Sequence, residues 1–299
     1  MNIVISGAGG FFGRELSKTL TEGGNQIFEL NRYNQEGLFK NCNLVNQNDI
    51  KKIAAIFTQI QPHTIYHLAA KTSIKNSWSS PFEFISYNLL LSENLLQAIQ
   101  LSKQEPLLII LSSSAVYDDS NQPIAEDYRL APNSPYAVSK LVTENLSRRY
   151  PKNIIIRPFF SLGFNKKNDV VIEWVDKLLK IEEYQQKILE VEDLTLERDY
   201  VDISEVARLL SQISEKGQIN EIYNLCSGTV TSLHQVCDAI ALKLNYSLTK
   251  ISKFTENREE IIRKKVIGDT SKLNSIGIFP NFNLQESVNS IIDQTYKII

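Results

Sequence analysis

The sequence predicts an α/β protein in which a parallel β-sheet carries helices on both faces. Short runs rich in β-branched residues alternate with longer segments of helical periodicity, which is the pattern of a parallel sheet. A glycine-rich turn directly follows the first of these runs. Small or polar residues stand where the later runs end, and folds of this class bind ligands at the carboxyl ends of their strands.

Composition excludes several classes of function. The 299 residues, 42% of them hydrophobic, are enough for one large or two unequal domains. With 32 basic and 34 acidic residues the net charge is −2, so no overall basic field exists to bind nucleic acid. Cys42, Cys226 and Cys237 fit neither a disulfide framework nor a metal site, which indicates the reduced thiols of a cytoplasmic protein. No apolar run approaches the ~20 residues of a membrane span.

The first strand, helix and intervening turn predict a Rossmann-type dinucleotide site. Asn2 to Ser6 is a β-rich run, and a helical segment follows the glycines. Gly7 permits a tight turn, Gly10 lets a diphosphate approach the backbone, and Gly13 lets helix and strand pack closely. The amino terminus of the helix then attracts the diphosphate.

The end of the second strand, predicted over 26–30, indicates which nicotinamide cofactor binds. An acidic residue here would bind the ribose 2′-hydroxyl, but the chain has Asn31 and Arg32. Arg32 can pair with a phosphate, although it can also be a solvated surface cation. We therefore predict NADPH, with NADH as the alternative.

Three further strands are predicted over residues 64–68, 107–111 and 153–157. Small or polar residues follow them, namely Ala69 and Ala70, then Ser113, then Pro158. Because parallel strands end at one edge of a sheet, we expect these residues to gather there with Gly7. His67, inside the first of these strands, is interpreted as a packing residue.

Tyr136 and Lys140 are four residues apart on a predicted helix and therefore share one face. Free tyrosine titrates near ~10, and a nearby positive charge favours its phenolate form. The hydroxyl of Ser113 can hold a substrate oxygen. These are the parts for moving a proton on a carbonyl or alcohol while a hydride moves elsewhere.

These motifs, together with His67-Leu68-Ala69-Ala70 and Arg157-Pro158-Phe159, resemble in type and order the extended short-chain dehydrogenases/reductases of the NAD-dependent epimerase/dehydratase family. That family acts largely on nucleotide sugars. The resemblance implies that Ser113 and Tyr136 are catalytic, and that Lys140 binds the nicotinamide ribose and lowers the pKa of the tyrosine. It also implies a homodimer formed through the Leu-rich helix after Pro81 and the helix of Tyr136. The implied cofactor contacts are Gly7, Gly10, Phe11, Phe12, Gly13, Asn31, Arg32, Asn43, Leu44, Leu68, Ala69, Ala70, Tyr136, Lys140 and Pro158.

The resemblance divides the chain into a dinucleotide-binding domain over 1–160 and a smaller α/β substrate-binding region over 161–299, partly interleaved with the sheet. The second region most resembles GDP-4-keto-6-deoxymannose reductases and related sugar-nucleotide 4-ketoreductases. By that resemblance Arg198 binds the substrate diphosphate, a bidentate contact that suits a guanidinium. The alternative is an ion pair with Asp199 or Asp202. The implied substrate contacts are Ser113, Ser114, Tyr136, Phe160, Arg198 and Arg263.

Four positions depart from the family pattern. Phe160 stands where the family's reductases often carry Asn, and Gly163-Phe164 stands where they carry a Gly-Pro pair. Asp118 stands where a Gly is usual, and Asn43 where an Asp is usual near the adenine. These positions concern substrate and cofactor binding rather than proton transfer. We therefore expect a different sugar or base with the chemistry retained.

Three reactions share this scaffold. A 4,6-dehydratase needs an acid and a base directly after the catalytic serine, where this chain has Ser114 and Ala115. A 4-epimerase usually favours NAD, and the missing acid after the second strand argues against it. A ketoreductase, the third reaction, needs only a hydride donor and the serine–tyrosine–lysine set. A redox-sensing binding protein, the alternative without catalysis, has no need of that set.

We predict reduction of the C4 ketone of a nucleoside-diphosphate-linked 4-keto-6-deoxyhexose, in deoxysugar biosynthesis, without a metal. The alternative is a nucleotide-sugar 4-epimerase. The nucleotide base and the C4 configuration of the product stay open.

Overall fold

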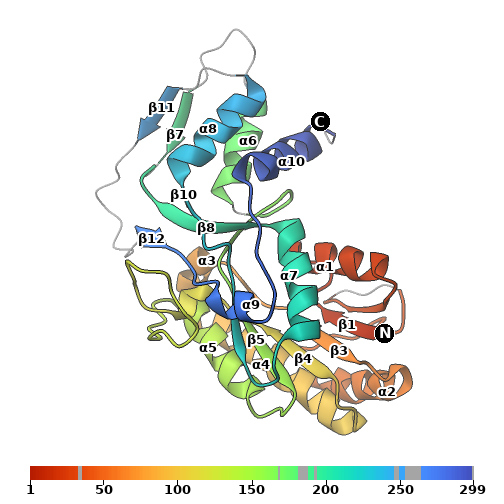
Figure 1. Cartoon of the computed structure of the whole chain (residues 1–299). Coiled ribbons are helices and arrows are strands. Elements are labelled where there is room, and N and C mark those ends of the chain that lie inside the picture. Colours follow the sequence, from red (N-terminus) through yellow and green to blue (C-terminus); the bar gives the residue numbers. More distant parts are fainter. Residues whose placement is uncertain are drawn as a thin grey trace.

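The computed structural model describes residues 1–32, 36–167, 169–180, 188–191, 194–245, 249–252 and 264–297. Its largest element is a six-stranded sheet in the order β2-β1-β3-β4-β5-β9 (Figure 1). Every neighbouring pair in it is parallel, which confirms the predicted fold class. The strands are β1 (Asn2–Ser6), β2 (Gln26–Leu30), β3 (Thr64–His67), β4 (Leu107–Leu111), β5 (Asn153–Pro158) and β9 (Ile222–Leu225).

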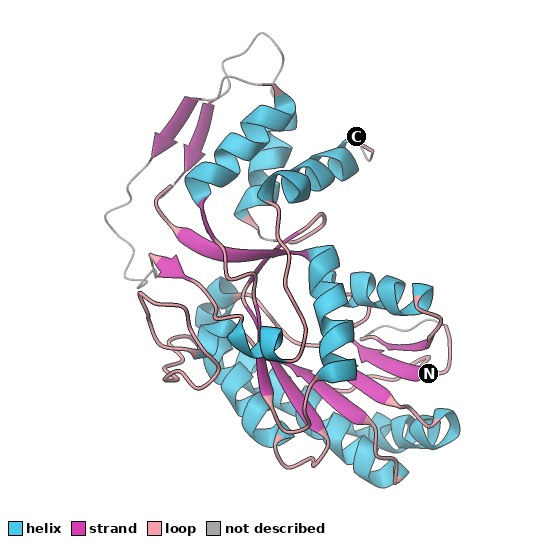
Figure 2. Ribbon diagram, viewed as in Figure 1, coloured by secondary structure: helices cyan, strands magenta, loops and turns pink. Residues whose placement is uncertain are grey.

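Helices cover both faces of this sheet (Figure 2). On one face lie α1 (Phe11–Glu22) and α7 (Ile203–Lys216), whose Leu16 and Leu210 share a core with Ile5. On the other lie α2 (Ile50–Ile60), α4 (Pro81–Ser102) and α5 (Pro135–Ser147). There Ile53 and Leu95 share a core with Val4. Val4 and Ile5 serve opposite cores because successive side chains of a strand point to opposite faces.

A smaller layer is built around β8 (Glu197–Asp202), which pairs with three short strands. These are β6 (Phe160–Leu162), β10 (Val230–Ser232) and β12 (Lys265–Val266). Three helices enclose a further core that includes Leu162 and Tyr200: α6 (Val170–Leu179), α8 (Leu233–Leu244) and α10 (Leu284–Tyr296). The remaining elements are β7 (Ile188–Val191), β11 (Thr249–Ser252), α3 (Ile74–Ser79), α9 (Ser271–Ser275) and the 3-10 turns η1 (Gln47–Asp49) and η2 (Ser114–Val116).

The two layers exchange segments along the chain. After β6 and β8 the chain returns to the large sheet, because α7 covers that sheet and β9 extends it (Figure 1). The chain then crosses back to form β10 and α8. The segment from β6 onwards therefore belongs partly to one layer and partly to the other.

Local signals set the start of α5, the helix that carries Tyr136 and Lys140. The side-chain oxygen of Ser134 accepts a hydrogen bond from the backbone N–H of Ala137 at 3.2 Å. Pro135 follows in the first turn, where its missing N–H costs nothing. The cap therefore fixes which residues face the sheet.

A buried ion pair joins α5 to β5. Arg157 donates from Nε and NH2 to the two carboxylate oxygens of Glu144, at 2.9 and 2.7 Å. Both side chains are only 1% exposed. Ser112 also donates to Glu144, and the ring of Tyr117 lies 4.7 Å from the Arg157 guanidinium. The pair thus fixes the helix of Lys140 against the strands that end beside it.

We predict that Glu144→Gln lowers the free energy of unfolding by about 3–5 kcal/mol, because it leaves a buried guanidinium without its counter-charge. The matched control is the pair between Lys243 and Asp293, which also lies at 2.7 Å but is 28% and 54% exposed. Lys243→Met should change stability by no more than about 1 kcal/mol. Urea unfolding of both variants measures the difference, and equal losses would contradict the prediction.

Candidate active site

The glycine turn after β1 forms a close-packed cradle at the carboxyl edge of the sheet. Gly7 has a φ of +79°, and a Cβ there would lie 2.8 Å from the backbone nitrogen of Ala69. A Cβ on Gly13 would lie 2.3 Å from the carbonyl oxygen of Gly7. Gly10 is the N-cap residue of α1 and makes no side-chain cap. No side chain therefore covers the first N–H groups of α1, and these groups can bind the oxygens of a diphosphate.

Two side chains hold the backbone of the glycine turn at Gly9. The side-chain oxygen of Asn31 accepts from the Gly9 N–H at 2.7 Å, and the side-chain nitrogen of Asn31 donates to the Glu29 carboxylate at 3.2 Å. The Nε of Arg14 donates to the Gly9 carbonyl at 2.9 Å. Arg14 was not among the predicted contacts, although its place directly after Gly13 was a visible signal.

Two further cations lie beside one aromatic ring where β2 and β3 end. The Arg32 guanidinium is 5.7 Å from the centre of the Tyr87 ring, and the Lys71 ammonium is 5.0 Å from it. Lys71 also forms an ion pair with Glu83. Neither Lys71 nor Tyr87 was predicted, because only the fold brings α4 beside the ends of these strands.

The other predicted cofactor residues are placed as follows. Asn43 turns its side-chain oxygen onto the backbone N–H of Val45 at 3.0 Å. Leu44 is buried, and its carbonyl accepts from Asn94 of α4 at 2.6 Å. Leu68, Ala69 and Ala70 directly follow β3, Pro158 is the last residue of β5, and Phe11 and Phe12 begin α1.

The structure brings Ser113, Tyr136 and Lys140 together where β4 ends. Ser113 is the N-cap residue of η2, its hydroxyl oxygen accepts from the Ala115 N–H at 3.1 Å, and it lies close enough to Tyr136 to affect the pKa of that phenol. Lys140 donates from Nζ to the carbonyl of Leu111, the last residue of β4, at 2.7 Å. Tyr136 and Lys140 are 8% and 4% exposed. Ser114, beside them, is also buried.

Burial controls the protonation of this set. Burial raises the pKa of Tyr136, while the side chain of Ser113 opposes the rise. Burial lowers the pKa of Lys140 to about 8, against the opposing effect of Glu144. The pKa of Tyr136 is therefore raised overall, whereas we expected the charge of Lys140 to lower it. A tyrosine that keeps its proton at neutral pH is suited to donate that proton.

Asn88 of α4 ties the Tyr136 turn to the loop after β3. Its side chain exchanges hydrogen bonds with the backbone of Lys71, at 2.8 Å from the Lys71 N–H and 3.1 Å to the Lys71 carbonyl. It also donates to the Ser139 hydroxyl at 2.8 Å, and Ser139 donates to the Tyr136 carbonyl at 2.7 Å. The side-chain amide of Asn88 therefore joins the loop after β3 to the turn of α5 that carries Tyr136.

His67 is a buried structural link beside the site. Its Nδ1 lies 2.7 Å from the Ser6 hydroxyl and its Nε2 3.1 Å from the Ser92 hydroxyl. Burial, and then the charge of Lys140, lower the pKa of His67 to about 3. The imidazole is therefore neutral, and it joins the end of β1, which leads into the glycine cradle, to β3 and α4.

Arg198 lies on β8 in the smaller layer. Its NH1 donates to the carbonyls of Glu197 at 2.8 Å and Lys264 at 3.2 Å, and its guanidinium lies 5.1 Å from the Phe160 ring centre. The Asp199 carboxylate accepts from the backbone of residues 227, 228 and 268, and that of Asp202 caps α7. Arg263, another predicted substrate contact, lies outside the described residues.

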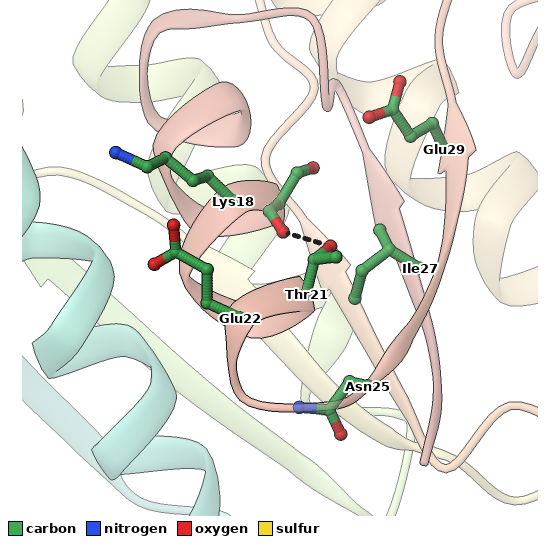
Figure 3. Close-up of a pocket in the computed structure, with 7 residues that line it drawn as sticks. Lys18, Thr21, Glu22, Asn25, Ile27 and Glu29 are labelled. Atoms are coloured by element: carbon green, nitrogen blue, oxygen red, sulfur yellow. Dashed lines mark hydrogen bonds between the residues drawn. The ribbon is translucent and has the colours of Figure 1, made fainter.

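A surface groove lies elsewhere, between α1 and β2 (Figure 3). It is lined by Ser17, Lys18, Thr21, Glu22, Asn25, Ile27 and Glu29. None of these is a predicted site residue. Because Asn25 precedes β2, the groove extends towards the amino end of that strand, away from the edge where Ser113 and Gly7 lie.

The fold and this serine–tyrosine–lysine set define a nicotinamide-dependent enzyme of the short-chain dehydrogenase/reductase type. Residues 3–226 match the NAD dependent epimerase/dehydratase family, and the chain belongs to that family. In the part of the chain that the structure describes, no helix is long and apolar enough to cross a membrane.

Several relatives are similar along most of the chain. A GDP-6-deoxy-D-mannose reductase of Pseudomonas aeruginosa is 26% identical over 242 residues, covering 77% of this chain and 79% of the relative. A GDP-6-deoxy-D-talose 4-dehydrogenase of Aggregatibacter actinomycetemcomitans is 25% identical, covering 99% and 97%. A putative UDP-glucose 4-epimerase of Methanocaldococcus jannaschii is also 25% identical, covering 97% of both chains.

Solved structures share the fold. That of RMD from Pseudomonas aeruginosa, complexed with NADPH, has a TM-score of 0.85 at 22% identity and covers 100% of this chain and 99% of its own. A UDP-glucose 4-epimerase of Thermotoga maritima, with UDP-glucose, has the same TM-score at 23% identity and the same coverage.

We predict that the neutral His67 makes folding pH-dependent. Its pKa in the folded protein lies below the value near 6.5 of an unfolded histidine, so only the unfolded chain takes up its proton in mild acid. The stability that His67 contributes is complete above the unfolded pKa near 6.5, and it is lost as the pH falls below that value. Between pH 8 and pH 5.5 the loss should be about 1.4 kcal/mol.

The measurement is urea unfolding of the wild type and His67→Gln across this pH range. The stability difference between them should shrink by that amount as the pH falls. Parallel curves for wild type and His67→Gln would show that His67 does not remain neutral.

Proposed function

We propose that the protein is an NADPH-dependent reductase of the C4 ketone of a nucleoside-diphosphate-linked 4-keto-6-deoxyhexose. The observation that carries this proposal is that Tyr136 is buried near Ser113 where β4 ends, with Lys140 one helical turn away and anchored to the Leu111 carbonyl. The names of the two relatives that act on GDP-6-deoxyhexoses support this substrate class. Because Ser114 and Ala115 supply no acid or base after Ser113, dehydration is not the proposed reaction.

The chain's own residues handle the proton in this mechanism. When bound, the nicotinamide cofactor supplies the hydride. Tyr136, whose pKa is raised by burial, donates its proton to the oxygen at C4 as the ketone becomes an alcohol. Ser113 holds that oxygen by a hydrogen bond. Lys140, fixed to the end of β4, binds the nicotinamide ribose and stabilises the charge that develops on Tyr136.

We propose NADPH over NADH for two reasons. No acidic side chain takes the place of Asn31, whose oxygen instead binds the Gly9 N–H. Arg32 and Arg14 both lie near this turn, one beside Tyr87 and one on the Gly9 carbonyl. Two guanidinium groups favour a ribose that carries a phosphate.

The substrate diphosphate is assigned to Arg198, and the smaller layer around β8 is the proposed substrate-binding region. The alternative function is a nucleotide-sugar 4-epimerase, which the putative epimerase among the relatives favours. An epimerase would use the same three residues, first to oxidise and then to reduce C4.

The deciding experiment mixes the protein with a panel of nucleotide-linked 4-keto-6-deoxy sugars and either NADPH or NADH. Loss of the absorbance of the reduced nicotinamide with one panel member would support the reductase and identify base and cofactor together. NMR of the product would give the C4 configuration. Interconversion of 4-hydroxy sugars without net use of cofactor would instead support the epimerase.

We predict that Tyr136→Phe lowers kcat by about 10²–10⁴-fold, the usual worth of a general acid. Affinity for NADPH should stay within about twofold, because the ring and its packing are retained. Tyr296→Phe is the control, since that tyrosine is 53% exposed at the end of α10. Near-normal turnover by Tyr136→Phe would remove Tyr136 from the mechanism.

We also propose a homodimer formed by the outer faces of α4 and α5. The sides of these helices that face away from the sheet carry apolar residues that are only half-buried: Leu89, Leu90, Val138, Leu141 and Val142. Covering such a face in a second copy would remove this apolar area from water.

A charge on that face should therefore separate the subunits. We predict that Val142→Glu halves the molar mass measured by light scattering, because a carboxylate would be desolvated in the interface. Leu242→Glu is the control, because Leu242 is 72% exposed on α8 and lies on another surface. A wild-type protein of monomer mass would refute the dimer itself.

A further inference from the structure

Phe160 is an exposed aromatic residue beside the proposed diphosphate contact. It begins β6, which runs parallel to β8 with Phe160 opposite Tyr200. Its side chain is 36% exposed, whereas Leu162, two residues on, is buried in the core. The ring centre lies 5.1 Å from the guanidinium of Arg198 and 6.0 Å from the Tyr200 ring, which meets it nearly edge-on at 69°.

Arg198 is held from more than one side. Its NH1 donates to the backbone carbonyls of Glu197 and Lys264, and the Phe160 ring lies against the guanidinium. Holding NH1 and one side of the group fixes the plane in which the rest of its fork of N–H donors lies. A fixed guanidinium loses less rotational freedom when it binds an anion, so more of the contact energy appears as affinity.

The strand that carries Arg198 is itself held rigidly. On the opposite face of β8, the Asp199 carboxylate accepts from the N–H and hydroxyl of Ser227 and from the N–H groups of Gly228 and Gly268, at 2.7–3.0 Å. Arg198 therefore starts from a backbone that is fixed to two other segments. The part of Arg198 that can still rotate is its long side chain, and the ring of Phe160 lies against the guanidinium at the end of that side chain.

We propose that Phe160 is a positioning residue that holds Arg198 in the orientation that binds the diphosphate of the nucleotide substrate. This inference rests on the proposed function, because it takes Arg198 as the diphosphate contact. The ring contributes through the face that it presents to the cation and offers no hydrogen-bonding atom of its own. Its effect should therefore reach the diphosphate only through Arg198.

Calorimetric binding of free GDP, UDP, dTDP and CDP tests this without requiring turnover. Phe160→Leu removes the ring but keeps an apolar side chain, and should weaken binding of the preferred nucleotide by about threefold to thirtyfold, the range of a cation–π contact. Phe160→Tyr restores the ring and should stay within about twofold of wild type. Affinity for NADPH should be the same in all three proteins.

A second background separates positioning from a general structural role. In Arg198→Lys the planar group is gone, so adding Phe160→Leu should cost clearly less than it does in wild type. An unchanged affinity in Phe160→Leu, or an equal loss in both backgrounds, would overturn the inference while leaving Arg198 as the diphosphate contact. Failure of wild type to bind any of the four nucleotides would overturn the proposed substrate class, and this inference with it.

Discussion

The candidate site depends on how α5 is fixed against the ends of β4 and β5. Lys140 and Glu144 lie one turn apart on the same face of this helix. Lys140 binds the last carbonyl of β4, and Glu144 binds Arg157 near the end of β5. One helix face is thereby anchored to two neighbouring strands. Tyr136, one turn earlier, then has little freedom to lie anywhere but beside Ser113.

These anchors also explain why so much polarity is buried next to the site. An ion pair in the interior recovers the cost of desolvation only when its geometry is good and its remaining atoms are hydrogen-bonded. Arg157 and Glu144 meet in two parallel hydrogen bonds, and Arg157 also donates from NH1 to the Glu126 carbonyl at 3.0 Å. The pair thus specifies one position of α5 more strictly than apolar packing would.

The sequence predicted the strands of the large sheet closely, because most of them carry an apolar run that ends at glycine, small or polar residues. The predicted residues lie at the carboxyl ends of these parallel strands. Gly7 follows β1, Ala69 follows β3, Ser113 follows β4, and Pro158 is the last residue of β5. The smaller layer could not be derived in the same way. β12 has two residues and β6 three, so their pairing with β8 is set by tertiary packing and not by local pattern.

Two of the residues missed near the site could be found only from the fold. Lys71 and Tyr87 are distant in sequence from Arg32, and only the packing of α4 on the sheet brings them together. Asp199 was considered as an ion-pair partner of its neighbour Arg198. Because adjacent residues of a strand point to opposite faces, its carboxylate instead lies among the backbone N–H groups of other segments.

The protonation of Tyr136 bears on the direction of the reaction. A reductase begins each turnover by giving a proton to the substrate oxygen, whereas an epimerase begins by removing one from an alcohol. Lys140 was expected to favour the phenolate, which suits the second task. Burial has the larger effect and raises the pKa of Tyr136, so the resting group is the acid. Burial of Tyr136 beside Ser113 therefore accounts for the acid form of the phenol, which is the form that the proposed reduction uses.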